Sequence, residues 1–193
     1  GVTLAAGATS VQIRVATTDD FAAEGNETFT LTATVTAGTT ANASATGTAT
    51  ISDDVDATTV TLTATPSVAE GGSITYTVTL SNAAVSAMTV TLSNGTVVNI
   101  AAGATSGSTP VLAPSDDVYV DAGSVSATIA TTSGGGFEAV TIDPAAATTA
   151  ITDTVDATTA TLTATPSVAE GGTITWTVSL TAPVTGTFCA SVS

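Results

Sequence analysis

The chain has 193 residues and a formal net charge of −15, because sixteen acidic residues stand against one base, Arg14. A chain with so few cations cannot neutralise phosphates, so its composition argues against nucleic acid and anionic membrane surfaces as partners. No apolar run approaches twenty residues, so no direct membrane insertion is expected. With no histidine and one cysteine, Cys189, it also excludes intrachain disulfides, Cys/His zinc sites and histidine-dependent catalysis.

Short strands are expected along the whole chain, because Thr, Ala, Val and Ser dominate and charged residues make up only 9%. Apolar and polar residues alternate in segments divided by Gly, Asn, Asp and Pro. The expected strands, in chain order, lie at 11–15, 29–35, 45–51, 60–65, 74–80, 88–92, 97–100, 125–129 and 140–142. Their apolar faces form the core and their Thr faces meet water. We expect Tyr76 and Trp176, and also Cys189, to be buried in that core.

An internal repeat sets the domain organisation. The segment DATTVTLTATPSVAEGGSITYTVTL begins at Asp56 and returns as DATTATLTATPSVAEGGTITWTVSL at Asp156, so the period is 100 residues. This is the size of one immunoglobulin-like sandwich. We therefore predict an all-β chain of tandem immunoglobulin-like antiparallel β-sandwiches. Residues 1–55 are the C-terminal part of one repeat, 56–155 a complete repeat and 156–193 the N-terminal part of a further repeat.

Two explanations fit the incomplete repeats at both ends. The opening residues GVTLAAGATS match VVNIAAGATS at Val97 and so resemble the middle of a domain. We expect the chain to be an excerpt of a longer repeat array. In the alternative, the front half at 156–193 completes the back half at 1–55 of a neighbouring molecule, as in polymers built by strand donation.

The acidic residues gather at turns and boundaries and leave the strands nearly uncharged. Three positions recur: an Asp-Asp pair opening a hairpin, an Asp cluster at each repeat boundary, and the Glu of SVAEGG. If these meet at one pole of a sandwich, their mutual repulsion requires a cation, and calcium accepts carboxylates in flexible geometry at extracellular concentrations. The candidate calcium ligands are Asp19, Asp20, Glu24, Glu27, Asp53, Asp54, Asp56, Glu70, Asp116, Asp117, Asp121, Asp153, Asp156 and Glu170.

An alternative role for acidic turns is solubility and protection of strand edges. Solubility alone does not require the same acids at the same positions of each repeat, so calcium is favoured. Glu138 and Asp143 have no matching acids in the first half-repeat and fit the solubility role better.

At these motifs the sequence resembles two related families. DDFAAEGNETFTLTATV and SVAEGGSITYTVTLSNA resemble Calx-beta domains. The full repeat, with SDDVYVDAGSVSATIATTSGGGFEAVTIDP and ITDTVDATT, is similar to the repeats of LapA-type giant adhesins. The resemblance implies type I secretion, retention at the bacterial outer membrane, and calcium at the domain poles. The full repeat departs from the Calx-beta pattern at Ser124, which stands where Glu27 supplies a carboxylate in the first half-repeat.

Together these features predict calcium-stabilised extender repeats of an extracellular, cell-surface adhesin that project a distal binding region for surface attachment and biofilm formation. The expected partners are neighbouring repeats of the same chain or identical subunits, with surfaces or glycans bound through other regions. The alternative is a protomer of an extracellular filament or surface layer assembled by intermolecular strand complementation. Catalysis by paired carboxylates is not expected, because the acids follow the repeat boundaries and aromatics make up only 4% of the chain.

Overall fold

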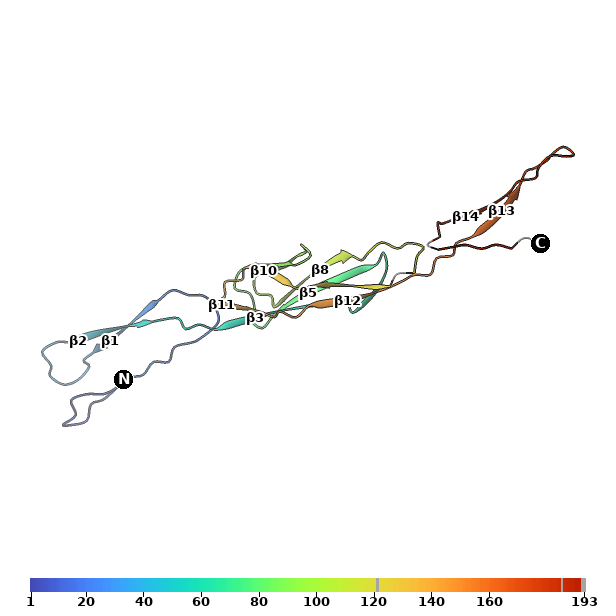
Figure 1. The fold of residues 1–193 in the computed structure, drawn as a ribbon. Coiled ribbons are helices and arrows are strands. Elements are labelled where there is room, and N and C mark those ends of the chain that lie inside the picture. The colour runs from blue at the N-terminus through green and yellow to red at the C-terminus, as the bar shows by residue number, and fades with distance from the viewer. Residues whose placement is uncertain (121, 185, 192–193) are drawn as a thin grey trace.

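The computed structural model describes residues 1–120, 122–184 and 186–191, and it is all-β over those residues, as predicted (Figure 1). The chain is drawn out in one direction. A hairpin lies at each end and the complete repeat lies between them. Within the described residues no helix is long and apolar enough to cross a membrane.

Each flanking part contains one antiparallel hairpin. In the first part β1 (Glu27–Thr34) pairs with β2 (Ser44–Ile51), and in the last part β13 (Ala160–Ala164) pairs with β14 (Trp176–Leu180). Within the described residues, each of these strands has only its hairpin partner, so both hairpins leave their outer edges unpaired.

The middle of the chain forms three sheets, each built from strands that are distant in sequence. Its strands are β3 (Ala57–Ala64), β4 (Ser67–Ala69), β5 (Ser73–Leu80), β6 (Met88–Leu92), β7 (Val97–Ile100), β8 (Ser106–Leu112), β9 (Gly123–Ala127), β10 (Ile129–Gly134), β11 (Ala139–Ile142) and β12 (Ala147–Thr152). The sheet orders are β11-β3-β5-β8, β10-β6-β7 and β4-β12-β9. Most neighbours are antiparallel, but β3·β11 and β4·β12 are parallel. Every sheet therefore joins a strand of the front half, β3–β7, to one of the back half, β8–β12.

The hydrophobic core lies entirely within this middle part. Its members run along the sequence from Val60 to Ile151, and the side chain of Tyr76 is completely buried among them. Along β5 the residues Ile74, Tyr76, Val78 and Leu80 point inward and alternate with threonines and a serine. This period of two is the pattern of a strand with one face in a core. Residues from both halves of the repeat thus contribute to one core.

Several sequence expectations differ from the structure. Residues 11–15 form no strand, because no described strand pairs with them, and β8 was missed because SGSTPVL lacks clear apolar alternation. Trp176 is 62% exposed and Cys189 is exposed, so neither is in a core. The reason is that no second sheet covers the hairpin β13–β14 in the described residues. The expected strands at 88–92 and 97–100 coincide with β6 and β7. The three-part division of the chain stays a prediction.

Candidate functional site

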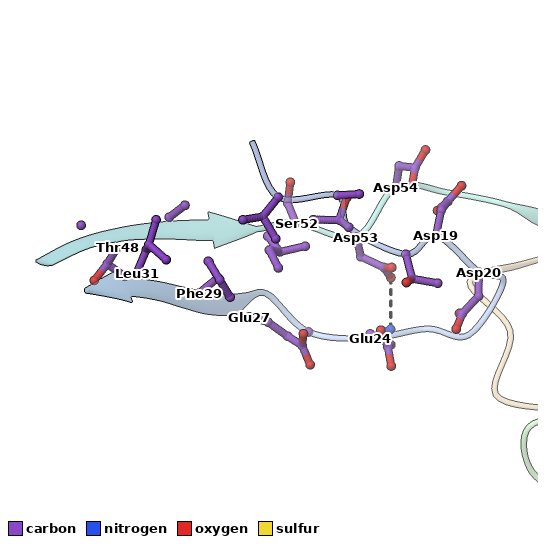
Figure 2. Close-up of a pocket in the computed structure, with 18 of the residues that line it drawn as sticks. Asp19, Asp20, Glu24, Glu27, Phe29, Leu31, Thr48, Ser52, Asp53 and Asp54 are labelled. Carbon is purple, nitrogen blue, oxygen red and sulfur yellow. Dashed lines mark hydrogen bonds between the residues drawn. The ribbon is translucent and has the colours of Figure 1, made fainter. Parts of the chain in front are cut away.

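Acidic side chains converge on the first repeat junction, residues 53–56, which connects β2 to β3 (Figure 2). The side chains of Asp19 and Asp54 lie beside each other at this junction. Interaction with the Asp54 carboxyl group, through hydrogen bonding and then through its negative charge, raises the pKa of Asp19 above its ordinary value of 3.8. Like charges are therefore held together here without a basic partner, since the only base of the chain is Arg14.

Two backbone amides of the first junction contribute further contacts. The Glu24 amide donates to Asp53 Oδ2 at 3.1 Å, and the Asp56 amide donates to Glu138 Oε2. The bond from Asp56 lowers the pKa of Glu138, but burial and the charges of Asp53 and Asp56 outweigh it, so the pKa is raised overall. Glu138 belongs to the complete repeat, the second unit, and Asp53 belongs to the repeat before it, the first unit. Carboxylates from two successive units therefore meet at this junction.

A non-ionic contact fixes the same two units to each other. Residue Ala22 forms an isolated antiparallel bridge with Phe137, the Ala23 amide donates to the Gly136 carbonyl at 3.0 Å, and the Glu138 amide donates to the Phe21 carbonyl at 3.4 Å. The rings of Phe21 and Phe137 are 6.4 Å apart and tilted at 46°, within the range of favourable aromatic pairs. The first unit is thus docked on the loop after β10.

Consecutive glycines place this loop. Residues Gly134, Gly135 and Gly136 all have positive φ, at 80°, 91° and 70°, a region that residues with a Cβ rarely adopt. At Gly134 a Cβ would also lie 2.3 Å from the carbonyl oxygen of Ala87. The sequence GGGFE can therefore turn sharply and present Phe137 and Glu138 to the junction.

The second junction, residues 153–156, reproduces part of this arrangement. Asp116 occupies the repeat position of Asp19, and Thr154 that of Asp54. The Thr154 hydroxyl donates to Asp116 Oδ1, so a neutral hydrogen-bond donor replaces the second carboxylate. The second junction consequently carries less repulsion at this position than the first.

In both Asp-Asp pairs that open the hairpin loops, the second aspartate accepts a hydrogen bond from a backbone amide. Asp20 Oδ1 accepts from the Ala22 amide at 2.8 Å, and Asp117 Oδ1 accepts from the Tyr119 amide at 2.7 Å. Such Asx turns fix the loop backbone two residues on. The recurrence of the second aspartate therefore has a structural explanation that needs no metal.

The Glu of SVAEGG lies close to the second junction. Glu70 is 9% exposed, its amide donates to the Thr152 carbonyl at 3.1 Å, and the amide of Gly71 donates to the Pro114 carbonyl at 2.6 Å. These bonds bring the loop after β4 against the chain that enters the junction. The predicted grouping of this loop, the hairpin loop and the junction at one pole thus matches the observed backbone contacts.

The remaining candidate ligands are dispersed. Glu27, Asp156 and Glu170 are exposed, and Asp121 lies outside the described residues. Among the described residues, no group of three acidic, histidine or cysteine side chains is placed so that it could hold a metal ion as it stands.

The strand registers revise one detail of the repeat alignment. Ile51 pairs with Glu27, and the matching Ile151 pairs with Gly123. Gly123, rather than Ser124, therefore stands at the position of Glu27. Neither residue can supply a carboxylate, so the second unit lacks this ligand in both alignments.

Chemically, the junctions suit a hard cation. Glu138 Oε1 at the first junction and Asp153 Oδ1 at the second are buried and have no hydrogen-bond partner in the described part of the chain. Buried carboxylate oxygens without partners are costly. Carboxylate oxygens of this kind are the oxygen type that calcium binds.

Sequence reasoning missed three contributors to the first junction. It assigned Glu138 to solubility and singled out neither Phe21 nor Phe137. The run GGGFE was visible, but its target lies far away in the sequence. Asp143, by contrast, lies outside the junction and accepts from the Ala145 amide at 2.9 Å, a turn contact that sequence reasoning did not predict.

Comparison with known proteins identifies the middle part. The family model for the LapA domain matches residues 56–154. No curated protein and no solved structure matches the chain. The match confirms the resemblance drawn from the repeat motifs and indicates an adhesion-related, structural role at the cell surface.

Proposed function

We propose that this chain, which belongs to the LapA domain family, forms calcium-stabilised extender repeats of a bacterial cell-surface adhesin. The proposal rests chiefly on the first junction, where Glu138 from the complete repeat meets Asp53 and Asp56 of the connecting segment. Because these acids come from two successive units, the negative charge at the junction depends on how the two units are joined. A cation bound there would link the two units as well as neutralise them.

Calcium is the cation that best fits this chemistry. The available donors are carboxylate and carbonyl oxygens, with neither histidine nor a junction cysteine. Calcium takes six to eight such oxygens in irregular geometry, whereas magnesium requires a strict octahedron. Because no group of three acidic side chains in the described residues is placed so that it could hold a metal ion as it stands, binding has to draw the junction carboxylates closer together.

The non-ionic contacts and the cation have different roles in this proposal. The bridge between Ala22 and Phe137 and the ring contact with Phe21 position the two units. Calcium then removes the repulsion around Asp19 and Asp54 and restrains the connecting segment. A series of such junctions would form a stiff array that projects a distal binding region from the cell for surface attachment and biofilm formation.

Thermal unfolding in calcium and in excess chelator tests the proposal. A site of extracellular affinity, with Kd of about 0.1 to 1 mM, stabilises the folded chain by about 1.4 to 2.7 kcal/mol at roughly 10 mM calcium. For a domain near 100 residues this corresponds to a rise of roughly 5 to 20 °C in Tm. Identical melting curves in both conditions would remove calcium from the account.

Matched variants locate the effect. The double variant Asp54→Asn and Glu138→Gln keeps the size of each side chain but removes two junction charges, so it should lose most of the calcium-dependent rise in Tm. Asp143→Asn removes a charge at a turn outside the junction, and its side-chain oxygen can still accept from the Ala145 amide. This control should keep the full calcium effect.

A further inference from the structure

The two strands of the complete repeat that adjoin the junctions lie inside sheets rather than at sheet edges. β3 begins directly after the first junction and lies between β11 and β5. β12 ends directly before the second junction and lies between β4 and β9. Figure 1 shows the two flanking hairpins on opposite sides of the complete repeat. A pull on the two junctions therefore acts on strands that each have a neighbour on both sides.

Two extended segments connect the first junction to the second. Residues 57–69 contain β3 and then β4, with Pro66 where the chain passes from one sheet to another. Residues 139–152 contain β11 and then β12. The two segments run parallel, with β3 beside β11 and β4 beside β12. Tension pulls the first segment from its start and the second from its end, so it acts to slide one along the other in opposite directions.

A ladder of backbone hydrogen bonds opposes this sliding at each end of the repeat. Near the first junction the register runs from Ala57 with Ala139 to Val60 with Ile142. Near the second junction it runs from Ser67 with Ala150 to Ala69 with Thr152. The bonds of a parallel ladder are evenly spaced, so sliding loads all of them at once, whereas peeling the strands apart from one end breaks them one after another.

A buried side chain joins the two segments between the ladders. The hydroxyl of Thr149, which is 0% exposed, donates to the Thr65 carbonyl at 2.6 Å. The Ala150 amide donates to the Pro66 carbonyl at 3.0 Å, directly beside this bond. Thr65 and Pro66 lie where the first segment changes sheet, so the segment is held to β12 at the point where its own two strands separate.

We propose that the complete repeat is a load-bearing unit whose resistance to tension comes from shear between residues 57–69 and residues 139–152. The inference rests on the proposed function only for the source of the tension, because an extender that holds a cell to a surface is pulled along its length. The bonds that carry the load are backbone and hydroxyl bonds, so the resistance does not require calcium. Its measure is the force needed to unfold the repeat, which reports the barrier to unfolding rather than the equilibrium stability.

Pulling the same fold in two directions with optical tweezers tests the proposal. In the whole chain with Cys189→Ser, the lengthwise version attaches handles at Val55→Cys and Val155→Cys, positions that are 76% and 96% exposed. The crosswise version attaches them at Val55→Cys and Val140→Cys, so that β3 is peeled from β11 at one end. The lengthwise unfolding force should be several-fold higher. Equal forces in the two directions would overturn the proposal. Both versions are pulled in the same buffer, so the comparison does not depend on whether calcium binds.

A matched pair of threonine variants then locates the load path in the lengthwise version. Thr149→Val keeps the shape of the buried side chain but removes its bond to the Thr65 carbonyl, so it should lower the unfolding force. Thr109→Val removes a similar bond, at 2.9 Å to the Val97 carbonyl, between two strands outside both segments. This control should leave the force unchanged. Chemical denaturation of both variants measures the equilibrium cost of each lost bond separately. An equal loss of force in the two variants would contradict the load path.

Discussion

Replacing Phe137 with alanine should loosen the first junction without unfolding the repeat. The change removes the ring that lies 6.4 Å from that of Phe21 but leaves the backbone bonds of Ala23 and Glu138 available. Aromatic pairs of this kind contribute about 0.5 to 1.5 kcal/mol. At about 1 kcal/mol, the ratio of docked to undocked first units should fall about fivefold.

Distances between spin labels on the two units report this ratio. Labels at Thr46→Cys on β2 and Ser108→Cys on β8, with Cys189→Ser to remove the native thiol, place one label in each unit. In chelator, Phe137→Ala should broaden the distance distribution and extend its tail. The control Phe188→Ala removes a ring at an exposed position outside the junction and should leave the distribution unchanged. An unchanged distribution for Phe137→Ala would refute the docking role of this contact.

Three further predictions concern the core, the glycine turn and pH. Tyr76→Ala should lower the free energy of unfolding by about 3 to 5 kcal/mol, measured by chemical denaturation, whereas Trp176→Ala at the matching exposed position should change it little. Gly134→Ala should cost more than Gly95→Ala in the same assay, since both have positive φ but only the first would meet a carbonyl oxygen, at 2.3 Å. In chelator, lowering the pH from neutral should raise the melting temperature, because the pKa of Asp19 in the folded chain lies above its ordinary 3.8. Between pH 3.8 and the folded-state pKa of Asp19, the folded chain binds more protons than the unfolded chain. The stabilisation that comes from protonating Asp19 is therefore complete below pH 3.8 and is lost as pH rises through the folded-state pKa.

The parts of the fold that follow local pattern could be predicted from the sequence. Strands β6 and β7 coincide with their expected ranges, and Tyr76 is buried as expected, because alternation and repeat period both report on which face meets the core. Trp176 has the same local pattern and is exposed. Local alternation indicates which face is apolar, but whether that face is covered depends on strands elsewhere in the chain.

The junction shows the same limit for the candidate site. Recurrence singled out Asp53 and Asp54 as boundary acids and Asp19 as the opening acid of a hairpin loop, because a repeat preserves such positions in sequence. It could not show that Glu138 bonds the Asp56 amide across 82 residues. That contact depends on the left-handed turn of the glycine run after β10, whose direction the sequence does not reveal.

The most direct test of the central claim is the width of the distance distribution between the two labelled units, measured in millimolar calcium and again after chelation on the same sample of dilute protein. If calcium bound at the first junction stiffens the connection, the distribution is narrow in calcium and broad in chelator, and it narrows again when calcium is restored. Equal widths in both conditions would show that the junction is held without calcium and would contradict the account.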